Sequence, residues 1–137
     1  MPDYSVMLVE DAGIVARDID QTVSQAGFDV PWKFSSAEEA LDWIKKETPD
    51  LILMDIQLSG EMDGIEATHE ITENWDIPVV FLTAYSNKET IDQVRETGAI
   101  AYLIKPLEKE DLLSIIEWLK NEQTGEKPSL ERGDFLE

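Results

Sequence analysis

The sequence predicts a doubly wound α/β domain, in which a parallel sheet of five strands carries helices on both faces. Strand-like and helix-like segments alternate about every 20 to 25 residues, a pattern typical of repeated strand–helix units. Several strand segments, such as Leu51–Met54 and Val79–Leu82, are unbroken apolar runs rather than alternating ones. Unbroken runs are typical of strands that are buried on both faces of a parallel sheet.

The individual elements follow from local signals. The predicted strands are Val6–Val9, Val30–Phe34, Leu51–Met54, Val79–Thr83 and Ala101–Ile104. The predicted helices are Gly13–Ala26, Ala37–Glu47, Gly64–Asn74, Lys88–Thr97 and Lys109–Asn121. Ser36 is a candidate N-cap, and Gly27 and Gly98 suit positions just beyond a helix C-terminus. Pro31 removes a backbone hydrogen-bond donor and so favours a position at the sheet edge for the second strand. An edge position for this strand, together with right-handed crossovers, fits the spatial strand order 2-1-3-4-5.

Length and composition restrict the class of protein. A chain of 137 residues is one domain, and the absence of cysteine excludes disulfides and thiolate metal ligands. No apolar run approaches the roughly 20 residues that span a bilayer, and no basic segment followed by an apolar stretch marks a secretion signal. The net charge of −19 opposes direct binding to nucleic acid or anionic membranes. We therefore expect a cytoplasmic protein with no nucleic-acid or membrane contact.

The pattern weakens after about residue 122. Residues 123–137 contain Gly125, Pro128 and Gly133 with few apolar residues, so we expect a linker or disordered tail after a domain at 1–122. Such a tail favours a chain excised from a longer protein over one that acts alone. Trp118 lies at the edge of the apolar stripe of the last helix, where it is either an interface anchor or an ordinary surface aromatic.

Polar side chains follow four of the predicted strands. Glu10 and Asp11 follow the first, Asp55 the third, Thr83 ends the fourth and Lys105 follows the fifth. Open α/β sheets place their sites at the carboxyl ends of the strands, so these five side chains should converge. Singly, each also fits a cap or a turn, but their occurrence together at one end of one sheet is specific.

Their chemistry indicates phosphoryl transfer to a carboxylate. Such a reaction needs a metal ion to neutralise charge, together with a cation and hydrogen-bond donors for the phosphoryl oxygens. Magnesium prefers carboxylates, carbonyls and water, so Asp11 and Asp55 suit direct ligation and Glu10 can hold a metal-bound water. Lys105 can pair with Asp55 before the reaction and with the phosphoryl group afterwards, and Thr83 offers a hydroxyl.

These residues resemble the receiver domain of two-component response regulators, a flavodoxin-like fold. The similarity covers about residues 5–121, through Glu10-Asp11, Leu53-Met54-Asp55, Asp63-Gly64, Leu82-Thr83-Ala84 and Tyr102-Leu103-Ile104-Lys105-Pro106. The resemblance implies that Asp55 accepts a phosphoryl group from a sensor histidine kinase or phosphotransfer domain. It implies that Glu10, Asp11, Asp55 and the backbone carbonyl of Gln57 bind Mg²⁺, and that Thr83 and Lys105 contact the phosphoryl group.

The resemblance also implies a switch. Thr83 and Tyr102 would change position on phosphorylation and alter the face formed by 88–97, 101–104 and 109–121, which an output domain or downstream protein would bind. The chain departs from the family pattern in the segment after Asp55, where Ser59 replaces a common proline and the loop to Gly64 is one residue longer. This version resembles receivers that are joined to sensory or kinase modules.

Three other functions were weighed. A haloacid-dehalogenase-type aspartyl-phosphate phosphatase also uses an Asp after an apolar strand, but its second acid lies two residues on, where this chain has Gln57. A degenerate receiver that only binds partners conflicts with the intact set of acids, Thr83 and Lys105. A flavodoxin-type cofactor binder lacks a phosphate-binding loop after the first strand. We therefore expect a signalling domain rather than an enzyme with a separate substrate.

Overall fold

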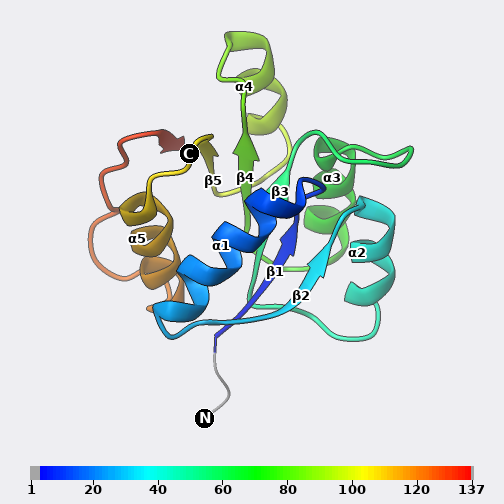
Figure 1. Cartoon of the computed structure of the whole chain (residues 1–137). Helices are drawn as coiled ribbons and strands as arrows, with labels where there is room; N and C mark the ends of the chain where they lie inside the picture. The colour runs from blue at the N-terminus through cyan, green and yellow to red at the C-terminus, as the bar shows by residue number, and fades with distance from the viewer. Residues whose placement is uncertain (1–3, 137) are drawn as a thin grey trace.

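The computed structural model describes residues 4–136. Six strands and five helices alternate along the chain (Figure 1). They are β1 (Ser5–Val9), α1 (Gly13–Gln25), β2 (Asp29–Phe34), α2 (Ala37–Ile44), β3 (Leu51–Asp55), α3 (Gly64–Asn74), β4 (Val79–Thr83), α4 (Lys88–Arg95), β5 (Ala101–Ile104), α5 (Lys109–Lys120) and β6 (Gly133–Phe135).

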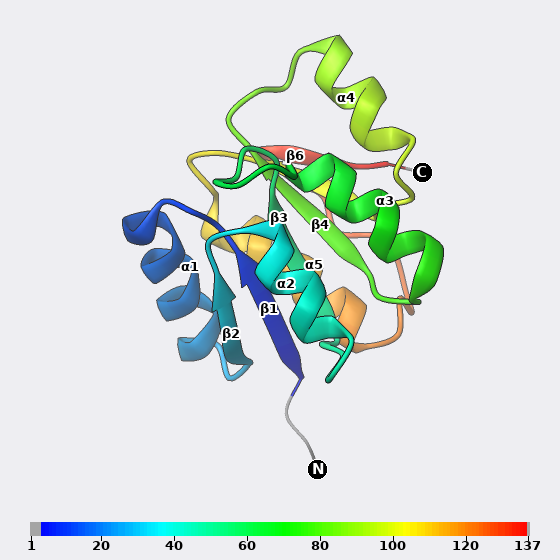
Figure 2. The same ribbon diagram turned by 90° about the vertical axis from the view of Figure 1, so that its right-hand side faces the viewer.

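The sheet has the order β2-β1-β3-β4-β5-β6, and β1 to β5 are parallel. Helices α1 and α5 cover one face and α2 and α3 the other, whereas α4 projects beyond them (Figures 1 and 2). The predicted doubly wound sheet and the order 2-1-3-4-5 are confirmed. The edge position of the strand that contains Pro31 is confirmed as well, since only β1 pairs with β2.

The central strands are buried because both of their faces meet apolar helix surfaces. Every residue of β3 and β4 is buried, including Asp55 and Thr83 at their carboxyl ends. Alternate residues of each strand enter two separate cores, so that Met54 packs on the α2 and α3 side and Leu53 on the α1 and α5 side. Burial of one such large side chain stabilises the fold by about 1.5–3 kcal/mol. The site residues thus extend from a rigid platform.

Side-chain caps set the starts of three helices. The Ser36 hydroxyl accepts a hydrogen bond from the Glu39 amide (3.3 Å), as its sequence position predicted. Asp63 and Glu66 form a reciprocal capping box at the start of α3. Helix α2 ends at Ile44, three residues before the predicted end, where the Lys46 amide donates to the Trp43 carbonyl (2.9 Å) in a tighter turn. Helix α4 ends at Arg95, two residues before the predicted end.

The prediction of a linker or disordered tail at 123–137 is wrong for its last part. Residues Gly133–Phe135 form β6, which pairs antiparallel with β5 and makes the sheet six-stranded rather than five-stranded. The sequence signal was weak because only three apolar residues of this segment, Leu130, Phe135 and Leu136, pack against the domain. They form no periodic pattern, so patterning could not reveal the strand. Glu137 lies outside the described residues.

Candidate functional site

A cleft of about 260 Å³ lies at the carboxyl ends of β1, β3, β4 and β5. Its lining includes all five side chains that the sequence singled out, namely Glu10, Asp11, Asp55, Thr83 and Lys105. They converge because the strands that precede them are parallel neighbours, so their ends meet at one edge of the sheet.

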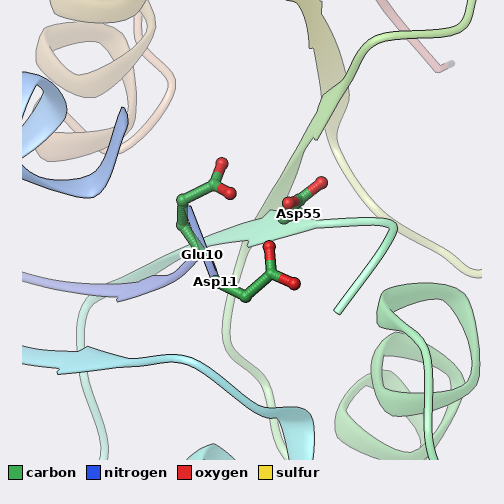
Figure 3. Close-up of side chains that lie close together, drawn as sticks. All are labelled: Glu10, Asp11 and Asp55. Carbon is green, nitrogen blue, oxygen red and sulfur yellow. The ribbon is translucent and has the colours of Figure 1, made fainter. Parts of the chain in front are cut away.

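Three carboxylates meet in this cleft. Glu10, Asp11 and Asp55 each contribute an oxygen, and these oxygens lie within 4.8 Å of one another (Figure 3). Glu10 and Asp55 are only 4% and 5% exposed, whereas Asp11 is exposed. Carboxylates held this close repel one another until a cation joins them. Oxygen-only ligands, two of them buried, fit the preference of Mg²⁺, so the residues present suit this ion.

Lys105 supplies the positive charge next to these acids. Its Nζ lies 2.6 Å from Glu10 Oε1 and 3.2 Å from Asp55 Oδ2. Its backbone amide donates to the Thr83 carbonyl (2.8 Å), which ties the loop after β5 to the end of β4. The expected pair with Asp55 is present, but the shorter contact is to Glu10, which sequence reasoning did not foresee. The lysine therefore bridges the two buried acids.

The electrostatics of the cleft shift two pKa values. Burial, and next the adjacent Glu10 carboxylate, raise the pKa of Asp55 from 3.8 to about 7, against the opposing effect of Lys105. The pKa of Lys105 is also raised: burial opposes its charge, but the pairs with Glu10 and Asp55 outweigh burial. Lys105 is thus held charged. With a pKa of about 7, Asp55 is only about half ionised at neutral pH, and a further cation would favour its ionised form.

Thr83 is engaged within its own loop. Its hydroxyl donates to the Tyr85 carbonyl (2.8 Å) and accepts from the Tyr85 amide (2.9 Å). The side chain is 2% exposed, while that of Tyr85 is 54% exposed at the rim of the cleft. A hydroxyl in this arrangement must exchange these bonds before it can serve a group on Asp55.

Gln57 and Tyr102 occupy different surroundings. Gln57 lines the cleft and its side chain is exposed. Its backbone amide donates to Asp55 Oδ1 (3.3 Å). Tyr102 lies on β5, half-buried and outside the cleft lining. Burial, and next the Asp134 carboxylate of β6, raise the pKa of Tyr102, and Arg95 opposes this. The structure therefore brings Gln57 to the acids and places Tyr102 opposite Asp134 of β6, outside the cleft.

The segment between Asp55 and Gly64 is held by a residue that the sequence did not single out. Glu38 on α2 accepts hydrogen bonds from the amides of Glu61 and Met62 (3.1 Å each). At Gly60 the backbone adopts a φ of +99°, and a Cβ there would lie 2.8 Å from Glu38. The positive φ is what favours glycine at this position, because other residues rarely adopt it.

Gly64 is required for a similar reason. An added Cβ would lie 2.0 Å from the backbone oxygen of Asp55. The start of α3 therefore packs directly against the end of β3. This close approach explains why glycine follows Asp63 in the sequence.

Comparison with known proteins agrees with this geometry. The model of the response regulator receiver domain family matches residues 6–117, and the chain belongs to this family. The transcriptional regulatory protein PdtaR of Mycobacterium tuberculosis is 32% identical over 112 residues, which are 82% of this chain and 54% of PdtaR. The chain thus spans about half the length of this relative.

Solved structures show the same fold. The signal receiver domain of a modulated diguanylate cyclase from Desulfovibrio desulfuricans G20 superposes with a TM-score of 0.80 at 28% identity, covering 87% of this chain and 94% of that one. The N-terminal domain of a response regulator/sensory box/GGDEF three-domain protein from Carboxydothermus hydrogenoformans gives 0.77 at 30% identity, covering 87% and 96%. The sheet and its helices are therefore those of a receiver domain.

Proposed function

We propose that this domain accepts a phosphoryl group on Asp55, in a Mg²⁺-dependent reaction, from the phosphohistidine of a sensor kinase or phosphotransfer domain. The observation that carries the proposal is the cluster of Glu10, Asp11 and Asp55 around one point, bridged by Lys105. Membership of the receiver family supports the same reaction. The domain then acts as a signalling switch rather than as an enzyme with a separate substrate.

The chemistry assigns a role to each residue. An Asp55 oxygen attacks the phosphorus, the bond from phosphorus to the imidazole nitrogen breaks, and the imidazole leaves with the electron pair. Mg²⁺, held by Glu10, Asp11, Asp55 and the Gln57 carbonyl, would neutralise charge on the phosphoryl oxygens. Lys105, now paired with Asp55, would pair with the transferred group. Thr83 would give up its bonds to Tyr85 and donate its hydroxyl to a phosphoryl oxygen.

The acid that a haloacid-dehalogenase-type phosphatase needs is absent, because Gln57 occupies its position. A degenerate receiver is disfavoured by the convergence of all three acids. Within residues 4–136, no helix is long and apolar enough to cross a membrane. We place the domain in the cytoplasm, where kinase phosphodonors are made, without direct contact to nucleic acid or membrane.

The proposal is tested by intact-mass measurement. Incubation with acetyl phosphate and Mg²⁺ should add one phosphoryl group per chain, and omission of Mg²⁺ should prevent the addition. No mass increase in the presence of both reagents would overturn the proposed function.

Phosphorylation should also alter the face formed by α4, β5 and α5. As Thr83 moves to the phosphoryl group, space opens that the Tyr102 ring can fill. The phosphoryl group thereby shifts the equilibrium between two arrangements of a distant surface. We expect amide NMR shifts across residues 91–105 in the wild type. Thr83→Ala should still be phosphorylated but lose most of these shifts. Shifts confined to the cleft in the wild type would contradict the switch.

The phosphorylated state should decay slowly. Water must approach opposite the Asp55 oxygen, past Gln57 and Tyr85, and neither carries a carboxylate that could orient it. Tyr85→Glu should speed the loss of the phosphoryl group at fixed Mg²⁺, and Tyr85→Ala should do so by opening the path. Equal decay rates in all three proteins would show that Tyr85 does not control access of water.

A further inference from the structure

The outer edge of β5 is covered by the chain's own C-terminal segment, Glu131–Leu136, called here the strap. The Ile104 amide donates to the Arg132 carbonyl (2.8 Å), and the Leu136 amide donates to the Ile100 carbonyl (2.9 Å). Between these bonds Gly133 lies opposite Leu103. A Cβ on Gly133 would lie 2.3 Å from the Tyr102 carbonyl oxygen. The strap therefore fits β5 closely in a single register.

Two further contacts hold the strap across the end of the sheet. Asp111 on α5 is 2% exposed, and its two carboxylate oxygens accept from the Glu131 and Arg132 amides (2.8 Å each). The Phe135 ring packs edge-on against Trp118 at 5.3 Å. Trp118, which the sequence marked as an interface anchor or a surface aromatic, thus binds the chain's own strap.

The strap reaches both faces of the sheet. Phe135 joins the core on the α5 side, whereas Leu136 joins the other core, which includes Val94, the only buried residue of α4. The strap therefore contacts β5 and α5 directly and shares a core with the buried residue of α4. In this arrangement the outer edge of β5 is not free for a partner.

The strap is also connected to the cleft. The Arg132 guanidinium donates to the backbone oxygens of Lys105 (2.9 Å) and Pro106 (3.2 Å), in the loop whose lysine reaches Glu10 and Asp55. Asp134 lies opposite Tyr102 in the pairing of β5 with β6. The strap thus contacts two of the three residues expected to move or re-pair on phosphorylation, Tyr102 and Lys105.

The structure shows the strap docked while Thr83 is bonded to Tyr85, which under the proposed function is the arrangement before phosphorylation. The docked strap is also held only weakly. Trp118 Nε1 is buried beneath the strap without a hydrogen-bond partner within residues 4–136, which costs free energy. Half of the strap residues, Glu131, Arg132 and Asp134, are exposed. Segments with few buried apolar groups open locally at low cost.

We propose that the strap is an intramolecular cover of the α4–β5–α5 face, docked in the resting protein and released when Asp55 is phosphorylated. The inference rests on the proposed function, since phosphorylation is the releasing signal. Movement of Tyr102 and re-pairing of Lys105 disturb the register of Gly133 and the carbonyls that Arg132 binds. Release uncovers the edge of β5 together with Trp118. By linkage, the docked strap in turn disfavours the phosphorylated arrangement.

Hydrogen exchange of the full chain tests the release. The amides of Ile104, Glu131, Arg132 and Leu136 should be protected at rest and exchange roughly tenfold faster or more after acetyl phosphate and Mg²⁺. Asp55→Asn under the same conditions should show no change. Intact mass is recorded on each sample, so that phosphorylation and release are measured separately.

Two outcomes overturn the inference in distinguishable ways. If the mass shows a phosphoryl group but these amides stay protected, the strap is a fixed strand and the proposed function stands. If no phosphoryl group is added, the proposed function fails and the strap inference fails with it.

The reverse coupling is tested with a variant that undocks the strap. Gly133→Ala places a Cβ against the Tyr102 carbonyl and should deprotect the strap without phosphorylation. It should bind beryllofluoride with Mg²⁺, a mimic of the phosphoryl group, roughly tenfold more tightly than the wild type. Ser129→Ala, an exposed position just before the strap, is the matched control and should leave both measurements unchanged. Unchanged beryllofluoride affinity in a deprotected Gly133→Ala protein would overturn the coupling.

Discussion

Replacement of Asp55 by asparagine is expected to abolish phosphoryl incorporation from acetyl phosphate in the presence of Mg²⁺. The amide keeps the shape of the side chain but offers no anionic oxygen to attack phosphorus. Asp55 is the acid that meets both the Glu10–Asp11 pair and Lys105 at the end of the central strand β3. Intact-mass spectrometry should show the unmodified mass only.

Asp42→Asn is the matched control for this substitution. Asp42 is an exposed acid on α2 outside the cleft, so its loss should leave the added mass unchanged. If Asp55→Asn still gains a phosphoryl group, the acceptor is another residue and the assignment of Asp55 is wrong. Peptide mapping of the wild type would then identify the acceptor.

The second large effect is a Mg²⁺ stabilisation that grows with pH. The pKa of Asp55 is raised from 3.8 to about 7, so between these values the folded protein binds more protons at this group than the unfolded chain does. The proton bound at Asp55 therefore stabilises the folded protein without Mg²⁺. This contribution is fully present below the unfolded pKa and is lost as the pH rises through 7. The loss can reach about 4 kcal/mol, because one pKa unit is about 1.4 kcal/mol.

Magnesium should compensate for this loss, since it binds the ionised form and screens the three carboxylates from one another. At a hundredfold excess over its Kd, a ligand of the folded state adds about 2.7 kcal/mol. For a chain of this size that corresponds to a rise in melting temperature of roughly 8 °C. The rise should be largest at pH 8 and small at pH 5, where protons compete for Asp55.

Two variants make the measurement specific. Asp11→Ala should remove most of the Mg²⁺-induced rise in melting temperature, and the exposed control Asp42→Ala should retain it. Without Mg²⁺, Asp55→Asn should weaken the dependence of the melting temperature on pH, because the titrating carboxyl group is gone. A Mg²⁺ effect that survives in Asp11→Ala, or that is equal at pH 5 and pH 8, would place the metal elsewhere.

The sheet and the cleft could be predicted from the sequence because their signals are local and repeated. Continuous apolar runs such as Leu51–Met54 mark strands buried on both faces, and parallel strands bring the residues after them to one edge. Chain order and the parallel direction of the strands were sufficient to predict that Glu10, Asp55 and Lys105 converge, and the structure places them in one cleft.

Contacts between segments far apart in the chain could not be predicted in this way. The shorter pair of Lys105 with Glu10, and the hold of Glu38 on the loop after Asp55, each depend on where two separate elements lie relative to each other. Neither leaves a periodic signal, because each contact joins single polar residues from two separate elements.

The strap is the clearest case. Residues 123–136 have the composition of a tail, with glycine, proline and charge, and composition reports only how much apolar surface a segment can bury. Whether so few contacts suffice depends on what is already folded beside them. Here the open edge of β5, the buried carboxylate of Asp111 and the ring of Trp118 provide a complementary surface. The sequence alone determined the five parallel strands and the acids of the cleft, whereas tertiary structure decided that Gly133–Phe135 pairs with the outer edge of β5.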